Sequence, residues 1–199
     1  LFVQQSLDAP GLALAAVALA IEQHYQPRYS GDGIPSEKVA VAVALADKLE
    51  ILTGMFGIGL VPSGDKDPFA LRRHALGVIR ILIEGNHALS LAQLVAASVT
   101  IFSIKNFKDP TSELLDFARE RLRGYLRDLG YNANEIEAVI SADLPVLSHI
   151  PKQLEAVRAF ATLPEAASLT AANKRVANIL KQAQAKGEVI QAAKHTVKL

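Results

Sequence analysis

The stretch TSELLDFARERLRGYLRDL, residues 111–129, decides the fold class, because it carries the clearest amphipathic pattern in the chain. Its apolar residues recur at helical spacing, and Gly130 behind them is a suitable stop. This pattern predicts a helix that packs one face against a core. The apolar stripe consists of Leu114, Leu115, Ala118, Leu122, Tyr125, Leu126 and Leu129.

Helical spacing continues through most of the remaining sequence. Val39, Val41 and Val43 alternate as in a strand, but the alanines between them and the leucines after them follow a helical period. Residues 75–83 are apolar on nearly all sides, which is typical of a helix in the middle of a core. We therefore predict an all-α fold. The expected helices span residues 10–25, 38–56, 67–84, 90–102, 111–129 and 134–141, with a last one after Thr162 that runs to about Lys186.

Side chains that can cap helices mark several of the expected starts. Asp67 precedes one helix, Asp8 the first one, and Ser90 can cap another. Thr162 and Glu165 have the spacing of a capping box ahead of the last helix. These residues predict where the helices begin.

A boundary between two domains is expected at Asn106–Pro110, directly before the amphipathic helix.

The charge is unevenly divided along the chain. Residues 152–199 carry eight Lys or Arg and three Glu, whereas residues 1–151 carry thirteen basic and seventeen acidic residues. The net charge of +1 therefore conceals a basic C-terminal quarter. A generic nucleic-acid coat would be strongly basic, so any RNA contact is expected to be local.

The composition also limits the class of protein. Half of the 199 residues are apolar, which excludes a disordered chain. The chain has no cysteine, which excludes disulfides and thiolate nucleophiles and suits a cytoplasmic protein. The most apolar stretch, residues 9–21, is shorter than the roughly 20 residues of a membrane helix. The chain starts with leucine, which is consistent with a part of a longer protein.

The sequence does not match the motifs of two common kinds of site, a phosphate-binding loop and a metal site of the HD type. The loop at residues 59–66 resembles a phosphate-binding loop, but Asp65 stands where the motif requires lysine. Helical phosphohydrolases of the HD type need a His-Asp dipeptide for their metal, and none of the five histidines precedes an aspartate. We expect no catalytic, cofactor-binding or metal-binding residue in this chain.

Two groups of basic residues remain as candidate sites. Arg72, Arg73 and Arg80 either pair with nearby acids such as Asp65, Asp67 and Glu84 or contact phosphates, for which the guanidinium fork is suited. The second group is Lys174, Arg175, Lys181 and Lys186, which few acidic residues neutralise. It is either a solvated helix face or a surface for a polyanion.

Several sequence blocks resemble one family. Residues 57–59 (GIG), 66–73 (KDPFALRR) and 77–81 (GVIRI) closely resemble the beta subunit of bacterial glycyl-tRNA synthetase. Residues 22–32 (EQHYQPRYSGD), 46–48 (ADK) and 172–180 (ANKRVANIL) are similar to further stretches of that family, in the same order.

The resemblance implies a fragment from the middle to late part of a longer subunit. It implies an HD-like helical domain at residues 1–105 and the start of a helical anticodon-binding-type domain at 106–199. In this family the beta chain works with a separate alpha subunit, which activates glycine with ATP, and the beta chain mainly grips tRNA-Gly. ATP and magnesium would serve the intact enzyme, with no cofactor in this chain.

The resemblance also makes Arg72, Arg73, Lys174, Arg175 and Lys181 candidate tRNA-binding residues. It implies a cytoplasmic protein with no membrane and no DNA as partner. The alternatives are an HD-type metal-dependent phosphohydrolase and a purely structural domain for subunit assembly.

Overall fold

The computed structural model describes residues 10–141 and 146–187 of the chain. Within these residues the regular structure is helical apart from one isolated bridge between Ser63 and Lys66, which confirms the all-α prediction. In the same part of the chain, no helix is long and apolar enough to cross a membrane. The elements are α1 (Pro10–Gln23), α2 (Lys38–Gly57), α3 (Leu71–Glu84), α4 (Leu91–Val99), α5 (Thr111–Asp128), α6 (Ala133–Ile140), the 3-10 helix η2 (Leu147–His149), α7 (Ile150–Ala161) and α8 (Ala166–Ala185).

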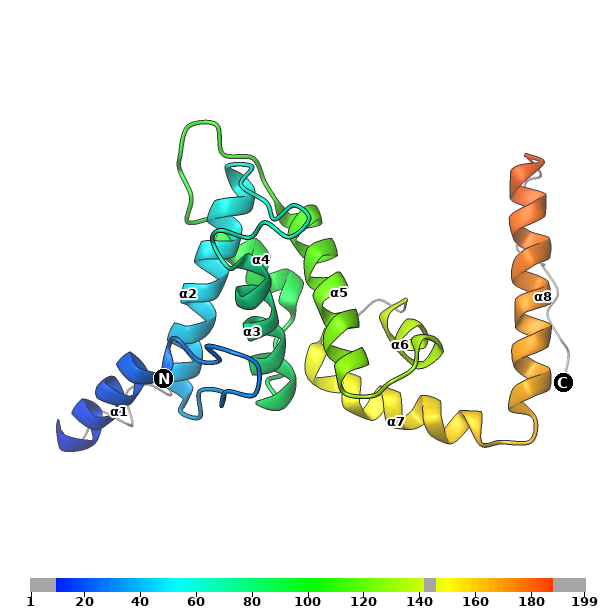
Figure 1. Cartoon of the computed structure of the whole chain (residues 1–199), viewed down its shortest axis with the longest axis horizontal. Helices are drawn as coiled ribbons and strands as arrows, with labels where there is room; N and C mark the ends of the chain where they lie inside the picture. Colours follow the sequence, from blue (N-terminus) through cyan, green and yellow to red (C-terminus); the bar gives the residue numbers. More distant parts are fainter. Residues whose placement is uncertain (1–9, 142–145, 188–199) are drawn as a thin grey trace, which may run out of the picture. The chain divides into compact units, whose positions relative to one another are not determined.

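The chain divides into two compact units, residues 1–155 and 156–199. Helices α1 to α6 belong to the first unit and α8 belongs to the second (Figure 1). The division falls within α7. The division into compact units does not test the family domain boundary expected between residues 105 and 106. That boundary stays a prediction.

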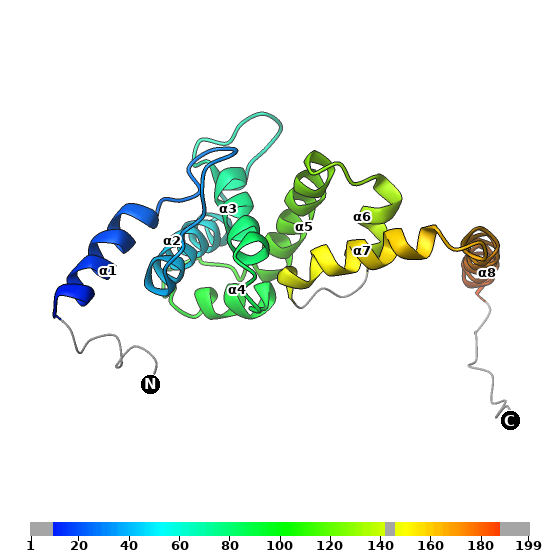
Figure 2. The same cartoon turned by 90° about the horizontal axis from the view of Figure 1, so that it is seen from below.

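The core of the first unit forms where α2, α3, α4 and α5 pack together, with α2 and α3 side by side (Figures 1 and 2). Ile81 and Leu82 of α3 are completely buried, as the apolar stretch at residues 75–83 predicts. The stripe on α5 packs against this centre through Leu114, Leu122 and Leu126. Leu129 is the exception, because α5 ends before it and leaves it 55% exposed.

Helix α3 begins later than expected, although its capping residue is correct. Ala70 adopts a left-handed conformation with φ 52°, so the regular helix starts at Leu71 rather than at residue 67. The Asp67 carboxylate nevertheless reaches the first turn, where it accepts hydrogen bonds from the N–H groups of Leu71 (2.8 Å) and Arg72 (3.0 Å). Its negative charge is favourable at a helix N-terminus.

The other predicted caps have mixed outcomes. Ser90 caps α4 by accepting from the N–H of Gln93, as expected. The predicted capping box at Thr162 and Glu165 is wrong, because the Thr162 hydroxyl donates to a carbonyl at the end of α7 and Glu165 makes no capping bond. The box forms instead at α6, between Asn132 and Glu135. The expected cap Asp8 lies outside the described residues.

Candidate nucleic-acid interface

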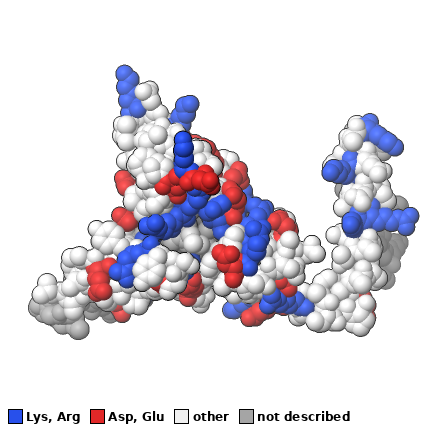
Figure 3. Space-filling model, in the orientation of Figure 1, with Lys and Arg blue, Asp and Glu red and all other residues white. Residues whose placement is uncertain are grey.

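Four arginines line one cavity of about 250 Å³ on the first unit, which we call the arginine groove. Arg72, Arg73 and Arg80 come from α3, and Arg121 comes from α5, which packs against α3. Asp128 contributes a negative charge to the same lining. Figure 3 shows Lys and Arg atoms gathered across the middle of the first unit. The groove is therefore a concave, mainly basic surface.

Hydrogen bonds within the protein hold the side chain of Arg80 in the lining of the groove. Its Nε donates to Glu84 Oε1 (2.6 Å) and its Nη2 donates to the carbonyl oxygen of Asp32 (2.7 Å). The Tyr125 hydroxyl donates to the same Glu84 carboxylate (3.0 Å). Burial and this hydrogen bond raise the pKa of Tyr125 to about 12, so the hydroxyl stays protonated. The ion pair with Glu84 was one of the two expected roles of Arg80. The hydrogen bond from Tyr125 to the same carboxylate joins α5 to α3.

Arg72 and Arg121 already use part of their hydrogen-bonding capacity within the protein. The Arg72 guanidinium donates to the carbonyl of Gly64 in the preceding loop. Arg121 pairs with the adjacent Glu120 and lies over the ring of Phe117, with 5.8 Å from its guanidinium carbon to the ring centroid. The Nε of Arg121 is buried and has no hydrogen-bond partner. One donor in the lining of the groove is therefore unsatisfied.

Arg73 is different from the other three. Its side chain is exposed, and within residues 10–141 and 146–187 the structure records no hydrogen bond or ion pair from its guanidinium. All five of its N–H donors are available to a ligand.

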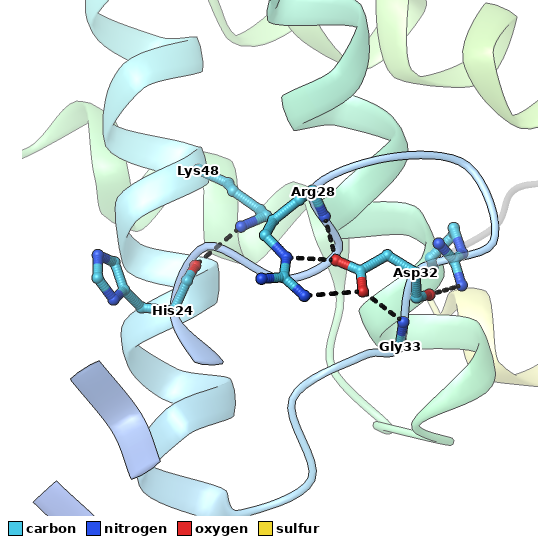
Figure 4. A network of polar contacts seen from close by, with 6 residues as sticks. His24, Arg28, Asp32, Gly33 and Lys48 are labelled. Carbon is cyan, nitrogen blue, oxygen red and sulfur yellow. Dashed lines mark hydrogen bonds and ion pairs between the residues drawn. The ribbon is translucent and has the colours of Figure 1, made fainter. Parts of the chain in front are cut away.

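A network of polar contacts holds the loop between α1 and α2 (Figure 4). The Asp32 carboxylate accepts from the backbone N–H and Nε of Arg28 (both 2.8 Å) and from the N–H of Gly33 (3.0 Å). The hydrogen bonds from Arg28 hold the pKa of Asp32 far below its ordinary value. This clamp positions Tyr29, which lines the groove.

A second cavity of about 300 Å³, which we call the Lys48 pocket, adjoins the arginine groove and shares Pro27 and Arg73 with it. Lys48 extends from α2 with only 2% of its surface exposed, and its Nζ donates to the carbonyl oxygen of His24 (3.0 Å; Figure 4). Burial lowers the pKa of Lys48. Burial, followed by the charge of Lys48, lowers the pKa of His74, which also lines this pocket.

The loop at residues 59–66 is a simple connection between helices. Ser63 and Lys66 exchange two backbone hydrogen bonds, of 3.1 and 2.9 Å, which close a tight turn. Elsewhere in the part of the chain that the structure describes, no group of three or more His, Cys, Asp or Glu side chains is placed to hold a metal ion.

The structure brings only some of the predicted site residues together. Arg72 and Arg73 line the same groove, while Lys174, Arg175 and Lys181 lie exposed on α8 in the second unit. Contact of any of these residues with RNA stays a prediction. Sequence reasoning did not single out Arg121 or Lys48 as site residues.

Comparison with known proteins gives a consistent result. A family model described as "Glycyl-tRNA synthetase beta subunit" matches residues 12–141. A glycine–tRNA ligase beta subunit from Acidovorax ebreus (strain TPSY) is 58% identical over 173 residues, which are 87% of this chain and 24% of that protein. The namesake protein from Polaromonas naphthalenivorans (strain CJ2) is 57% identical over 168 residues, 84% of this chain and 24% of its own length.

The chain thus spans about a quarter of the length of the curated relatives it matches. The family model covers well over half of the chain, including every residue of the arginine groove and the Lys48 pocket. The resemblance seen in the sequence blocks is confirmed, and the chain belongs to the glycyl-tRNA synthetase beta subunit family.

Proposed function

We propose that this chain is a non-catalytic helical region of a glycine–tRNA ligase that helps bind and orient tRNA-Gly. The arginine groove is the proposed contact surface. The observation that carries this proposal is the guanidinium of Arg73, which lies in a cavity beside three further arginines and has no recorded partner among residues 10–141 and 146–187. Guanidinium groups donate in a planar fork that fits phosphate oxygens, so an exposed arginine without a partner is a suitable phosphate ligand.

Recognition of this kind depends on charge and shape. Phosphate contacts fix the register and orientation of a nucleic acid but do not read its sequence. Double-stranded RNA is recognised mainly through its shape, its 2′-hydroxyls and its phosphates. In the proposed mechanism, Arg80 and the clamped loop keep the shape of the groove, and Arg72 and Arg73 neutralise phosphates.

The basic face of α8 is a proposed second contact. Lys174 and Lys181 are seven residues apart and therefore share one face of this exposed helix, with Arg175 next to the first. A second basic surface would increase affinity by joining two weak contacts in one molecule.

The rest of the proposal concerns the longer protein. We propose that it works with an alpha subunit, that ATP and magnesium serve the intact cytoplasmic enzyme, and that it uses neither membrane nor DNA. Residues 1–105 are proposed as an HD-like domain and residues 106–199 as the start of an anticodon-binding-type domain. The HD-type phosphohydrolase remains the alternative, and no specific observation favours it.

The arginine groove is tested by replacing Arg73. Arg73→Gln is expected to weaken binding of a tRNA-Gly transcript in a fluorescence anisotropy titration, because one phosphate contact is lost. The slope of log affinity against log salt should also become shallower by about 0.7–0.9. The matched control is Arg127→Gln, which removes the same charge from an exposed position of α5 outside both cavities.

Equal losses in the two variants would mean that the overall charge matters and the groove does not. If the unaltered chain shows no affinity for tRNA even at low salt, direct recognition is excluded. A structural role in subunit assembly would then be the better proposal.

A further inference from the structure

The Lys48 pocket contains nitrogen donors that the described part of the chain leaves unused. Lys48 Nζ has three hydrogens, and the structure records one hydrogen bond from it, to the His24 carbonyl oxygen. The ring of His74 and the guanidinium of Arg73 line the same cavity, and no hydrogen bond is recorded for either group within the described residues. A buried ammonium with unused donors is costly, and an acceptor that enters the cavity would reduce that cost.

The charges around the pocket favour an anion. Arg28 also lines the cavity, but its charge is matched by Asp32 through a fork of hydrogen bonds. Asp47 is the acidic residue in the lining; it is half-buried and its charge acts to raise the pKa of Lys48 and His74, but within the described residues no ion pair joins it to Lys48 or Arg73. Lys48 and Arg73 are therefore cations without a bonded carboxylate.

The size and shape of the cavity indicate more than a single ion. A volume of about 300 Å³ is at the lower end of small-molecule pockets, which span roughly 300–1,000 Å³. Tyr25 lines the cavity and is 62% exposed; its ring lies against that of His24, with 3.7 Å between the centroids, and its exposed part is open to a planar group. Aromatic side chains stack on unpaired nucleobases in this way.

We propose that the Lys48 pocket binds one nucleoside phosphate unit, whose phosphate accepts hydrogen bonds from Lys48, Arg73 and His74 and whose base stacks on Tyr25. The unit is either a free nucleotide or an unpaired nucleotide within RNA, because both offer the same phosphate and base. The site is distinct from the arginine groove, with which it shares Arg73 and Pro27. It does not require that the groove binds tRNA.

The test is a calorimetric titration of the full 199-residue chain with five probes. The probes are adenosine 5′-monophosphate, adenosine, inorganic phosphate, and a short single-stranded RNA compared with its own duplex. The nucleotide or the single strand is expected to bind, while adenosine and the duplex bind at least about tenfold more weakly because they lack the phosphate or an unstacked base. Binding of the free nucleotide assigns the pocket to a small molecule, and binding of the single strand alone assigns it to RNA; either result supports the proposal.

Three variants locate the binding. Lys48→Met keeps most of the unbranched side chain and removes its charge, and it should weaken binding about tenfold or more. Tyr25→Ala should weaken nucleotide binding but leave inorganic phosphate unaffected. His74→Gln should weaken the contact to the phosphate and leave the stacking of the base on Tyr25 unchanged. Arg127→Gln is the control and should bind like the unaltered chain.

The proposal is overturned if neither the nucleotide nor the single strand binds at millimolar concentration, or if Lys48→Met binds as well as the unaltered chain. If Lys48→Met fails to fold, as judged by its circular dichroism, Tyr25→Ala and His74→Gln decide the matter, and unchanged binding in both refutes the site. Tyr25 and His74 line the Lys48 pocket but not the arginine groove. Binding of tRNA to these two variants therefore tests the proposal for the groove separately from the proposal for the pocket.

Discussion

Gly77 of α3 lies directly against the side chain of Lys48 from α2. A Cβ atom at this position would lie 2.8 Å from Cε and 3.0 Å from Cδ of Lys48. Gly77→Ala is therefore expected to destabilise the first unit by about 1–3 kcal/mol, because the buried lysine stem has to move. Urea unfolding measures this change.

The matched control is Gly124→Ala in the interior of α5. A Cβ atom there meets nothing within 4 Å, and alanine is the better helix former by up to about 1 kcal/mol. This variant should be as stable as the unaltered chain or more stable. A Gly77→Ala variant that is also stabilised would show that Lys48 does not pack over α3 as the structure places it.

Individual site residues were only partly predictable from the sequence. Arg72 and Arg73 could be proposed because they stand together on a predicted helix. Lys48 and Arg121 could not, since a lysine among alanines and an arginine beside a leucine stripe look like ordinary exposed residues. Lys48 is buried and Arg121 partly covered because of the elements that pack around them, and that information is in the tertiary fold.

At the scale of a helix, Asp67 determines how α3 begins. Its two carboxylate oxygens accept from two backbone N–H groups that have no partner within the helix. Asp67→Ala is expected to cost about 1 kcal/mol of unfolding free energy, the usual loss for an N-terminal cap. Glu37→Ala is the control, because Glu37 stands at the N-terminus of α2 without a side-chain capping bond. Similar losses in both variants, again from urea unfolding, would contradict the capping role.

The helices themselves were largely predictable, and their ends were less so. The period of apolar residues located α2, α3 and α5, because each buries one face or more in the core. The box at Thr162 and Glu165 failed, since a threonine hydroxyl can equally well bond to the helix that precedes it. The Asn132–Glu135 box had the same spacing signal and was overlooked.

For the whole molecule, the two compact units make different contributions to stability. Within α8, Ala166 alone is buried, whereas α7 buries Ile150 and Leu154. A chain that ends at Ala161 is therefore expected to keep its thermal midpoint within about 2 °C, since a loss of 1 kcal/mol would shift it by roughly 2–8 °C. Calorimetry measures the midpoint, and a drop of more than about 5 °C would show that α8 supports the first unit.

The same shortened chain tests the proposed second RNA contact. Removing Lys174, Arg175 and Lys181 should make the salt dependence of tRNA binding shallower by about 0.7–0.9 for each of them that contacts a phosphate. An unchanged slope would leave the arginine groove as the sole proposed surface.

Arg80 is held by hydrogen bonds within the protein and Arg73 is not, within the described residues. This difference limits which substitutions the surface can accept during evolution. Arg80 serves the Glu84 carboxylate and the Asp32 carbonyl at once, which a lysine with its single ammonium cannot reproduce in the same plane. Arg73 has no such partner within the described residues, so a lysine there would keep the positive charge without disturbing a neighbour. Arginine at position 80 should therefore persist among relatives that differ widely in their substrates, whereas position 73 is free to drift between the two basic residues and to tune affinity as it does so.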